Sequence, residues 1–282
     1  MKSVCDYYVL KNGVNLPCIG FGTWKIQEEE AKEQVLKALR AGYRHIDTAA
    51  FYGNEKGIGE ALRQTELKRE EIFITSKVWN DDQGYEECKE AFQKSLERLG
   101  IEYLDMYLIH WPIAYAHREN WSDYVKATWK AMEELYEEGR IRAIGVCNFM
   151  PHHLEPLMEN CSIEPMVNQI EFHPGLLQEE TVAYCKSHDI QIEAWAPLAR
   201  QAILEVEELK DIAHQYGRTI AQITLRWELQ KGIVPLPKSS NYERMIENRK
   251  IFDFELTQED MERIDQIKDC EGSGQHPDYI KF

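Results

Sequence analysis

Four polar side chains of complementary chemistry stand at or just beyond the ends of apolar stretches within the first 110 residues. They are Asp47, Tyr52, Lys77 and His110. A buried lysine needs a carboxylate partner, which Asp47 can supply. The phenol of Tyr52 has an ordinary pKa of about 10, and a neighbouring lysine is expected to lower that pKa. The set could therefore protonate a carbonyl oxygen while the imidazole of His110 orients that oxygen.

Reduction of a carbonyl carbon also needs a hydride donor. Because no side chain stores a hydride, a nicotinamide cofactor is the natural source. Each residue taken alone has an ordinary structural explanation. Asp47 could cap a helix or pair with Arg44, Lys77 could extend to solvent, and His110 could be a satisfied core histidine. Four such groups near the ends of neighbouring strands favour a common site.

The elements that position these residues are short β-rich stretches separated by helical patterns. The eight stretches span 18–22, 43–47, 72–78, 104–110, 141–147, 166–172, 190–196 and 232–237. Alternation of strand and helix predicts parallel strands joined by right-handed crossovers. Eight such units in about 250 residues are typical of a closed (β/α)8 barrel, whose strand ends gather the chemistry at one face. We therefore predict an α/β TIM barrel with extra helices, forming a single domain over residues 1–282.

An open doubly wound sheet is the main alternative to a barrel. That fold usually carries a G-x-G-x-x-G motif after its first strand, whereas residues 20–24 are Gly-Phe-Gly-Thr-Trp without a third glycine. The stretch 10–17, with Asn12 and Gly13 at its turn, predicts a short N-terminal β-hairpin. We expect this hairpin to plug one end of the barrel.

Composition limits the possible partners and compartments. The net charge of −16 argues against nucleic acid and anionic membrane surfaces. No apolar run reaches the length of a membrane span, and the N-terminal stretch is a poor signal peptide. The seven cysteines show no zinc spacing, so we expect reduced thiols, no metal and a cytoplasmic location. His152 and His153 are expected at an exposed helix start, and no obligatory protein partner is indicated.

Three further stretches carry recognisable motifs. They are GYRHIDTA at 42–49, followed by Glu55 and Gly59, then GVCNF at 145–149 and LPKSSNYERMIEN at 236–248. With these motifs, and from about residue 16 to residue 268, the chain resembles the aldo-keto reductase family. It is similar in particular to the compact prokaryotic members of the 2,5-diketo-gluconate reductase and glyoxal reductase type. Those members reduce small dicarbonyls, keto sugars or a broad range of aldehydes.

The resemblance implies an eightfold barrel that reduces aldehydes and ketones with NADPH or, less often, NADH. It makes Tyr52 the proton donor, Lys77 and Asp47 the pair that tunes it, and His110 the orienting group. Asn148 and Gln169 would hold the nicotinamide carboxamide, and Trp195 would stack on the nicotinamide ring. The implied cofactor contacts are Gly22, Thr23, Trp24, Asp47, Asn148, Gln169, Trp195, Leu198, Lys238, Ser239, Arg244 and Asn248.

Two residues depart from the family pattern near the expected cofactor. Cys147 stands where the family more often has a serine, and Ala196 stands where a serine usually follows the stacking aromatic residue. Both changes are expected to weaken side-chain hydrogen bonds. The run PLARQ at 197–201 also lacks the glycines usual after PL. The flap over the pyrophosphate is therefore expected to close differently.

Charge also bears on the choice between NADPH and NADH. A protein with a net charge of −16 repels a polyanion, so a preference for the extra phosphate needs local cations. Lys238, Ser239 and Arg244 lie within seven residues of one another, and an arginine can bind a phosphate through two parallel hydrogen bonds. We expect tighter binding of NADPH than of NADH. The alternative is that Arg244 pairs with Glu243 or Glu247 on the helix surface.

The sequence also indicates where the carbonyl substrate would bind. Trp24, Trp79 and Trp111 follow strand ends, and with His110 they are expected to form an apolar pocket mouth. Core packing could explain any one of the three. The loops after His110 and Trp195 and the tail 269–282 would shape this pocket, but they contain no readable substrate code.

Two other functions stay open on the sequence. Some members of the family are cofactor-binding regulatory subunits, and such a subunit would bind NADPH while turning over aldehydes poorly. A phosphate-binding barrel could instead use Lys77 to form a Schiff base, which borohydride would trap. The complete set of four polar side chains favours a working reductase over both alternatives.

Overall fold

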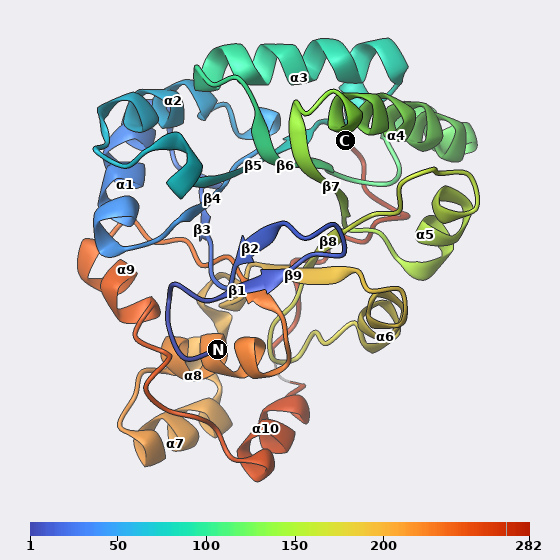
Figure 1. Ribbon diagram of the computed structural model, residues 1–282. Helices are drawn as coiled ribbons and strands as arrows, with labels where there is room; N and C mark the ends of the chain where they lie inside the picture. The colour runs from blue at the N-terminus through green and yellow to red at the C-terminus, as the bar shows by residue number, and fades with distance from the viewer. Residues whose placement is uncertain (269) are drawn as a thin grey trace.

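Eight parallel strands form the central sheet of the computed structural model, which describes residues 1–268 and 270–282. They are β3 Phe21–Gly22, β4 His45–Asp47, β5 Phe73–Val78, β6 Leu104–Ile109, β7 Ile141–Cys147, β8 Val167–Glu171, β9 Gln191–Trp195 and β10 Val234–Pro235, each paired with the next. The first and last strands also meet, because the Gly20 N–H donates to the Pro235 carbonyl at 3.0 Å and the Gly22 N–H donates to the Pro237 carbonyl at 3.2 Å. The sheet therefore closes into the predicted barrel, and Figure 1 looks into its ring.

All eight predicted strands are present, although most are shorter than predicted. The last one is ordered as a ladder only over Val234–Pro235. Proline has no N–H to donate, so Pro235 and Pro237 can contribute only carbonyl groups to a ladder. His110 lies one residue beyond the end of β6, although its N–H still donates to the Val78 carbonyl at 3.2 Å.

Helices surround the barrel, as Figure 1 shows. They are α1 Glu28–Ala41, α2 Glu55–Gln64, α3 Tyr85–Leu99, α4 Trp121–Glu137, α5 Pro151–Met158, α6 Glu179–Ser187, α7 Glu207–Tyr216, α8 Ile220–Gln230, α9 Tyr242–Asn248 and α10 Gln258–Asp265. In α4, Val125, Trp129 and Met132 recur at helical spacing and are buried against the barrel. The start of α5 differs from the prediction, because His152 is exposed but the His153 side chain is fully buried.

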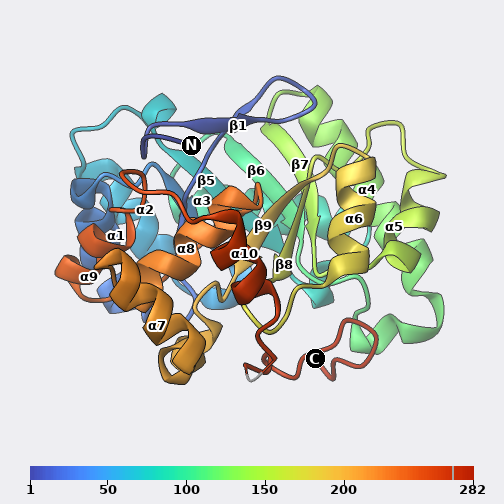
Figure 2. The same ribbon diagram turned by 90° about the horizontal axis from the view of Figure 1, so that it is seen from below.

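The N-terminal hairpin lies across one end of the barrel, and the C-terminal segment lies at the other end (Figure 2). Strand β1 Tyr7–Val9 pairs antiparallel with β2 Asn15–Pro17. The Leu16 side chain is fully buried, and the Tyr8 hydroxyl donates a hydrogen bond to the Leu229 carbonyl at 3.3 Å. These contacts confirm the prediction that the hairpin closes one end.

One hydrophobic cluster joins buried side chains from Leu10 to Cys270. On this basis we propose that residues 1–282 form one domain, since separate domains would each need their own core. All seven cysteines are free thiols. No helix within residues 1–268 and 270–282 combines the length and the apolar character needed to cross a membrane.

Candidate active site

The strand ends bring the four predicted catalytic side chains to one face of the barrel. Asp47 is the last residue of β4, Lys77 is the last but one of β5, and His110 follows β6 directly. Tyr52 ends a short 3-10 turn, Ala50–Tyr52, that follows β4. Gly53 stops this turn with a φ of 67°, a left-handed conformation that glycine adopts without strain. The four groups meet as the sequence predicted.

Lys77 and Asp47 form a buried ion pair at the base of this face. The Lys77 ammonium donates to both carboxylate oxygens of Asp47 at 2.8 Å and to the Thr48 carbonyl at 3.0 Å. The lysine side chain is fully buried. Burial alone would lower the pKa of Lys77, but the charge of Asp47 raises it above its ordinary value. Lys77 is therefore an ammonium ion at neutral pH.

Tyr52 lies within reach of this ammonium ion. The distance from Lys77 Nζ to the Tyr52 hydroxyl is 3.5 Å, and the same nitrogen is 5.2 Å from the centre of the phenol ring. The pKa of Tyr52 is nevertheless raised, because burial of the phenolate outweighs the attraction of Lys77 and because Asp47 opposes that attraction. The expectation of a lowered pKa is thus wrong for this state. The phenol keeps its proton at neutral pH, as a proton donor must.

His110 packs beside the phenol of Tyr52. The ring centroids of His110 and Tyr52 are 5.7 Å apart. Burial and the charge of Lys77 hold the pKa of His110 well below its ordinary value, so the imidazole is neutral. Its buried Nδ1 forms no hydrogen bond with any described residue. A neutral imidazole has one N–H donor and can hydrogen-bond a carbonyl oxygen.

A second layer of polar side chains supports Asp47 from below. Gln169 Nε2 donates to Asp47 Oδ2 at 2.8 Å and to Glu193 Oε2 at 3.0 Å. Both amide donors are thus directed at carboxyl groups, and Gln169 Oε1 lies 3.9 Å from Cys147 Sγ. Burial and the nearby charge of Asp47 raise the pKa of Glu193 to about 8. Glu193 is therefore largely protonated at neutral pH.

Asn148 lies at the centre of the predicted nicotinamide contacts. It adopts a φ of 64°, and its amide group donates to the His110 carbonyl at 3.0 Å. Trp195 Nε1 donates to Asn148 Oδ1 at 2.8 Å. The amide of Asn148 also lies 3.2 Å from the Cys147 thiol. The predicted role in holding a carboxamide would therefore require Asn148 to exchange one of these hydrogen bonds.

The predicted contacts after the first strand adjoin the Asp47 backbone. The Thr23 hydroxyl donates to the Asp47 carbonyl at 2.9 Å. At Gly22 a β-carbon would lie 3.1 Å from the Leu236 carbonyl oxygen, a tight contact, so glycine favours the close approach of the two end strands. Trp24 is exposed, and its ring centroid is 4.9 Å from that of Tyr52.

Two cations with no ion-pair partner mark the predicted phosphate end. Lys238 and Arg244 are exposed, and neither forms an ion pair with any other described residue. The alternative pairing of Arg244 with Glu243 or Glu247 is thus not seen. Ser239 Oγ accepts a hydrogen bond from the backbone N–H of the residue that caps α9, at 3.1 Å. Asn248, the last residue of α9, is buried.

The loop after β9 is strained where the sequence lacks glycine. Ala199, Arg200 and Gln201 have φ values of 43°, 52° and 82°, and Ala196 has a φ of 50°. Residues other than glycine seldom adopt these values because the β-carbon crowds the backbone. Leu198, which precedes them, is half-buried. The loop therefore follows this path without the usual glycines and at a conformational cost, and its different closure over the pyrophosphate stays a prediction.

Aromatic rings gather around Tyr52 and His110. Trp79 stacks on Phe51 with ring centroids 3.7 Å apart, and it lies 5.1 Å from the His110 ring. The Phe282 ring is 5.4 Å from Trp79 and 5.6 Å from Trp111. We name this cluster the aromatic mouth; its members are Trp24, Phe51, Tyr52, Trp79, His110, Trp111 and Phe282. It brings together the tryptophans that the sequence assigned to the substrate pocket.

Comparison with known proteins gives the family. The model of the aldo/keto reductase family matches residues 18–269. The chain belongs to this family. Glyoxal reductase from Bacillus subtilis (strain 168) is 51% identical to this aldo/keto reductase over 281 residues, which covers 99% of each chain. Methylglyoxal reductase DkgA from Escherichia coli (strain K12) is 42% identical and covers 95% of this chain and 96% of its own.

Solved structures of other aldo/keto reductases have the same fold. The enzyme MGS-M4, from a deep-sea metagenome library, superposes with a TM-score of 0.92 at 44% identity and covers 98% of this chain and 100% of its own. A variant of Gox0644 in complex with NADPH superposes with a TM-score of 0.90 at 39% identity, and 98% of each chain is covered.

Three residues of this aldo/keto reductase site were not found from its sequence. Glu193 lies inside the predicted apolar strand 190–196. A glutamate in such a strand indicates a buried carboxyl group, and this signal could have identified it. Phe51 directly precedes Tyr52 in the 3-10 turn, and its ring stacks on Trp79. Phe282 is distant in sequence from the other rings, and no local pattern predicts that the tail reaches them.

Proposed function

We propose that this aldo/keto reductase reduces small aldehydes and ketones with NADPH, and that Tyr52 supplies the proton. One observation carries the proposal: a protonated phenol lies beside a buried ammonium ion and a neutral imidazole on the same barrel face. Similar enzymes named for the reduction of glyoxal and methylglyoxal support the substrate class. The NADPH complex of a similar structure supports the cofactor.

The proton chemistry follows from the charges around Tyr52. The bound nicotinamide would supply the hydride for the carbonyl carbon. The neutral His110 donates a hydrogen bond to the carbonyl oxygen and fixes its direction. As negative charge develops on that oxygen, Tyr52 releases its proton to it. The phenolate that remains lies 3.5 Å from the Lys77 ammonium ion, which stabilises it, and Asp47 keeps the ammonium ion in place.

The residues present fit a phosphorylated dinucleotide. Lys238 and Arg244 are exposed cations on the loop and helix after β10, and no described carboxylate neutralises them. They would hold the extra phosphate of NADPH. Gln169 directs both amide donors at Asp47 and Glu193, which leaves its carbonyl oxygen to accept from a carboxamide. Trp195 lies at the end of β9 and would provide a flat surface for the ring.

The aromatic mouth favours small substrates. Phe51 and Phe282 both pack on Trp79, which contacts His110, and we infer that the two rings restrict the approach of a substrate to His110. A short dicarbonyl or a small aldehyde would pass these rings more readily than a bulky ketone. We therefore propose glyoxal-like and methylglyoxal-like compounds as the preferred substrate class.

The two rival functions have less support. A lysine that forms a Schiff base must react as a neutral amine, whereas Asp47 keeps Lys77 charged. A regulatory subunit would not need the complete set of proton-donating groups. No described feature favours either function.

We also propose a cytoplasmic enzyme that acts without an obligatory protein partner. Seven free thiols support a reducing compartment, because disulfides are rare there. Purified chain that reduces methylglyoxal without any added protein would establish that no partner is required.

The test of the proposed function is a substrate panel. The purified chain is mixed with NADPH and with glyoxal, methylglyoxal, glyceraldehyde or a bulky aromatic ketone, and NADPH absorbance is followed. We expect turnover of the small carbonyl compounds and a lower kcat/KM for the bulky ketone. Binding of NADPH without consumption of any carbonyl compound would favour the regulatory alternative.

A further inference from the structure

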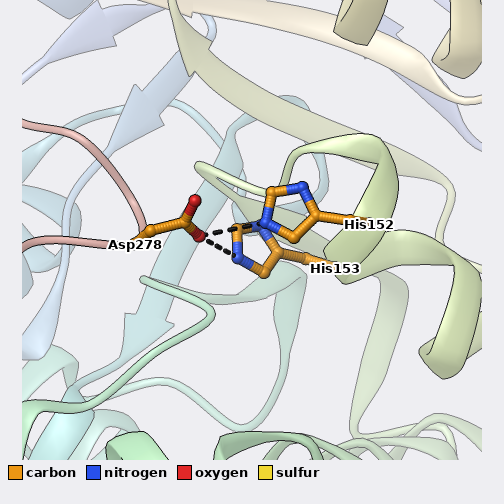
Figure 3. A group of neighbouring side chains, drawn as sticks. All are labelled: His152, His153 and Asp278. Atoms are coloured by element: carbon orange, nitrogen blue, oxygen red, sulfur yellow. Dashed lines mark hydrogen bonds and ion pairs between the residues drawn. The ribbon is translucent and has the colours of Figure 1, made fainter.

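Three metal-ligating side chains converge at a place remote in sequence from the catalytic set (Figure 3). His152 and His153 stand in the first turn of α5, and Asp278 belongs to the C-terminal segment. We propose that His152, His153 and Asp278 bind a divalent first-row transition ion of the Zn²⁺ class, which fastens the C-terminal segment to α5. Imidazole and carboxylate groups are common ligands of such ions.

The distances between the three groups suit an ion between them. His152 Nε2 is 3.0 Å from Asp278 Oδ1, and His153 Nε2 is 2.8 Å from the same oxygen. All three ligand atoms lie within 4.8 Å of one another. In a tetrahedral site with bonds of about 2.0 Å, neighbouring donor atoms are about 3.3 Å apart. A movement of a few tenths of an ångström would bring each histidine nitrogen to this distance from Asp278 Oδ1.

The direction of the buried histidine supports this placement. His153 is fully buried, and its Nε2 forms no hydrogen bond with a described residue although Asp278 Oδ1 is only 2.8 Å away. The carboxylate oxygen thus lies off the direction of the ring nitrogen. A nitrogen aimed beside the oxygen is poorly placed for a hydrogen bond but well placed for an ion that both atoms share. His152 by contrast does make a hydrogen bond to Asp278 at 3.0 Å.

The surroundings would complete the coordination and shield it. His276 Nδ1 is 3.7 Å from Asp278 Oδ2 and could approach as a fourth ligand. The ring of Trp121 packs edge-on against His153 at 5.1 Å and covers its buried side. Three protein ligands with one exchangeable position, or four with His276, are both usual for zinc.

Binding has an identifiable cost at the helix start. The Met150 N–H donates to His153 Nδ1 at 3.1 Å and so caps α5. A neutral imidazole that binds a metal through Nε2 carries its proton on Nδ1, where it would face this N–H. The ion must therefore displace the cap. We accordingly expect a reversible site of moderate affinity rather than a permanent structural metal.

The bound ion would restrain the segment that ends at the aromatic mouth. Arg118 already donates to the Asp278 carbonyl at 2.8 Å, and Asn80 donates to the Phe282 carbonyl at 3.0 Å. Asp278 is thus one of several points at which this segment is attached, together with Ser273 and Phe282. A metal bond there would slow the local opening of residues 270–282.

The first experiment measures ion binding by the full chain after chelator treatment. Calorimetric titration with Zn²⁺ is carried out on the wild type, His152→Ala and Asp278→Asn, with thermal unfolding as a check on folding. His214→Ala is the matched control, since His214 is an exposed histidine of α7 outside the cluster. We expect the control to bind like wild type and the two cluster variants to bind roughly tenfold to a hundredfold more weakly. Equal affinity in all four proteins would overturn the proposal.

A second measurement separates this site from the free thiols and needs no variant. Co²⁺ added to the wild type should give visible d–d bands without the near-ultraviolet charge-transfer band of a cobalt–thiolate bond. Hydrogen exchange of residues 270–282 should slow when Zn²⁺ is added. A thiolate band, no binding at all, or exchange that is unchanged by the ion would each contradict the proposal. None of these readouts depends on reductase activity, so the proposed function and this site can fail separately.

Discussion

At the scale of single residues, the site depends on which groups carry charge when they are buried. Lys77 stays charged because Asp47 holds it through two bonds of 2.8 Å. Tyr52 and His110 stay neutral because burial disfavours their charged forms. We therefore propose that Lys77 stabilises the phenolate that forms during the reaction rather than lowering the pKa of the resting phenol.

The first prediction concerns Lys77→Met, which keeps the length of the side chain and removes its charge. Without the ammonium ion the developing phenolate loses its stabilisation, so kcat should fall by roughly 100-fold or more. Asp47→Asn should have a smaller effect, because Lys77 keeps its charge. Steady-state kinetics at several pH values provide the measurement, with circular dichroism as the check that Asp47, left unpaired, has not unfolded the protein. Equal turnover in wild type and Lys77→Met would refute the coupling.

The second prediction concerns the buried Glu193. Its pKa of about 8 in the folded protein exceeds the ordinary value of 4.5. The folded state therefore holds this proton more tightly than the unfolded state. The contribution of this proton to the free energy of unfolding is fully present below about pH 4.5 and is lost as the pH rises through about 8. As the pH rises between these limits, the free energy of unfolding should therefore fall less for Glu193→Gln than for the wild type. The difference should be on the order of a few kcal/mol.

Urea unfolding at pH 5, 6.5 and 8 measures this difference in pH dependence. Gln169 Nε2 can donate to the glutamine carbonyl as it does to Glu193, so the variant keeps that contact. If both proteins lost stability in parallel over the range, Glu193 would not be protonated in the folded state.

At the scale of elements, we propose that two segments beyond the strand ends contact the cofactor. The segment after β10 presents Lys238 and Arg244 without described ion-pair partners. The loop after β9 holds three consecutive residues other than glycine at positive φ. We propose that the first segment recognises the extra phosphate of NADPH and that the second closes over the pyrophosphate.

The third prediction is that Arg244→Ala weakens the binding of NADPH far more than the binding of NADH. A charge-assisted contact is worth about 1.5–3 kcal/mol, which corresponds to roughly tenfold to a hundredfold in affinity. The preference for NADPH should also shrink as salt is added, because the site is exposed. Fluorescence titration with each cofactor measures both effects, and Lys250→Ala, an exposed cation just after α9, is the matched control. Equal weakening of both cofactors would mean that Arg244 contacts the adenine instead.

The fourth prediction concerns strain in the loop after β9. Gln201 has a φ of 82°, where glycine avoids crowding by the β-carbon. Gln201→Gly should therefore stabilise the protein by about 0.5–1 kcal/mol, after the greater chain entropy of glycine is subtracted. Thermal unfolding is the measurement. Glu205→Gly, in the same segment but not at positive φ, should destabilise it, and a loss of similar size in both variants would argue against strain at Gln201.

At the scale of the whole molecule, the alternation of strands and helices was enough to predict the barrel and the face that carries the site. Asp47, Lys77 and His110 could be found because parallel strand ends share one face whatever the details of packing. The direction of the Tyr52 pKa shift could not be predicted from the sequence, because it depends on how far burial outweighs one neighbouring charge. Phe282 and the buried position of His153 depend on where the tail and α5 pack, which no local pattern encodes.

The most direct test of the account is the turnover of Tyr52→Phe with methylglyoxal and NADPH. The change removes only the hydroxyl and keeps the ring that packs at 4.9 Å from Trp24 and 5.7 Å from His110. Tyr7→Phe, an equal change on the hairpin at the opposite end of the barrel, is the control. The account predicts a kcat lowered by roughly 10²–10⁴-fold in Tyr52→Phe, with NADPH affinity and the control unchanged. A Tyr52→Phe variant that turns over methylglyoxal at nearly the wild-type rate would contradict it.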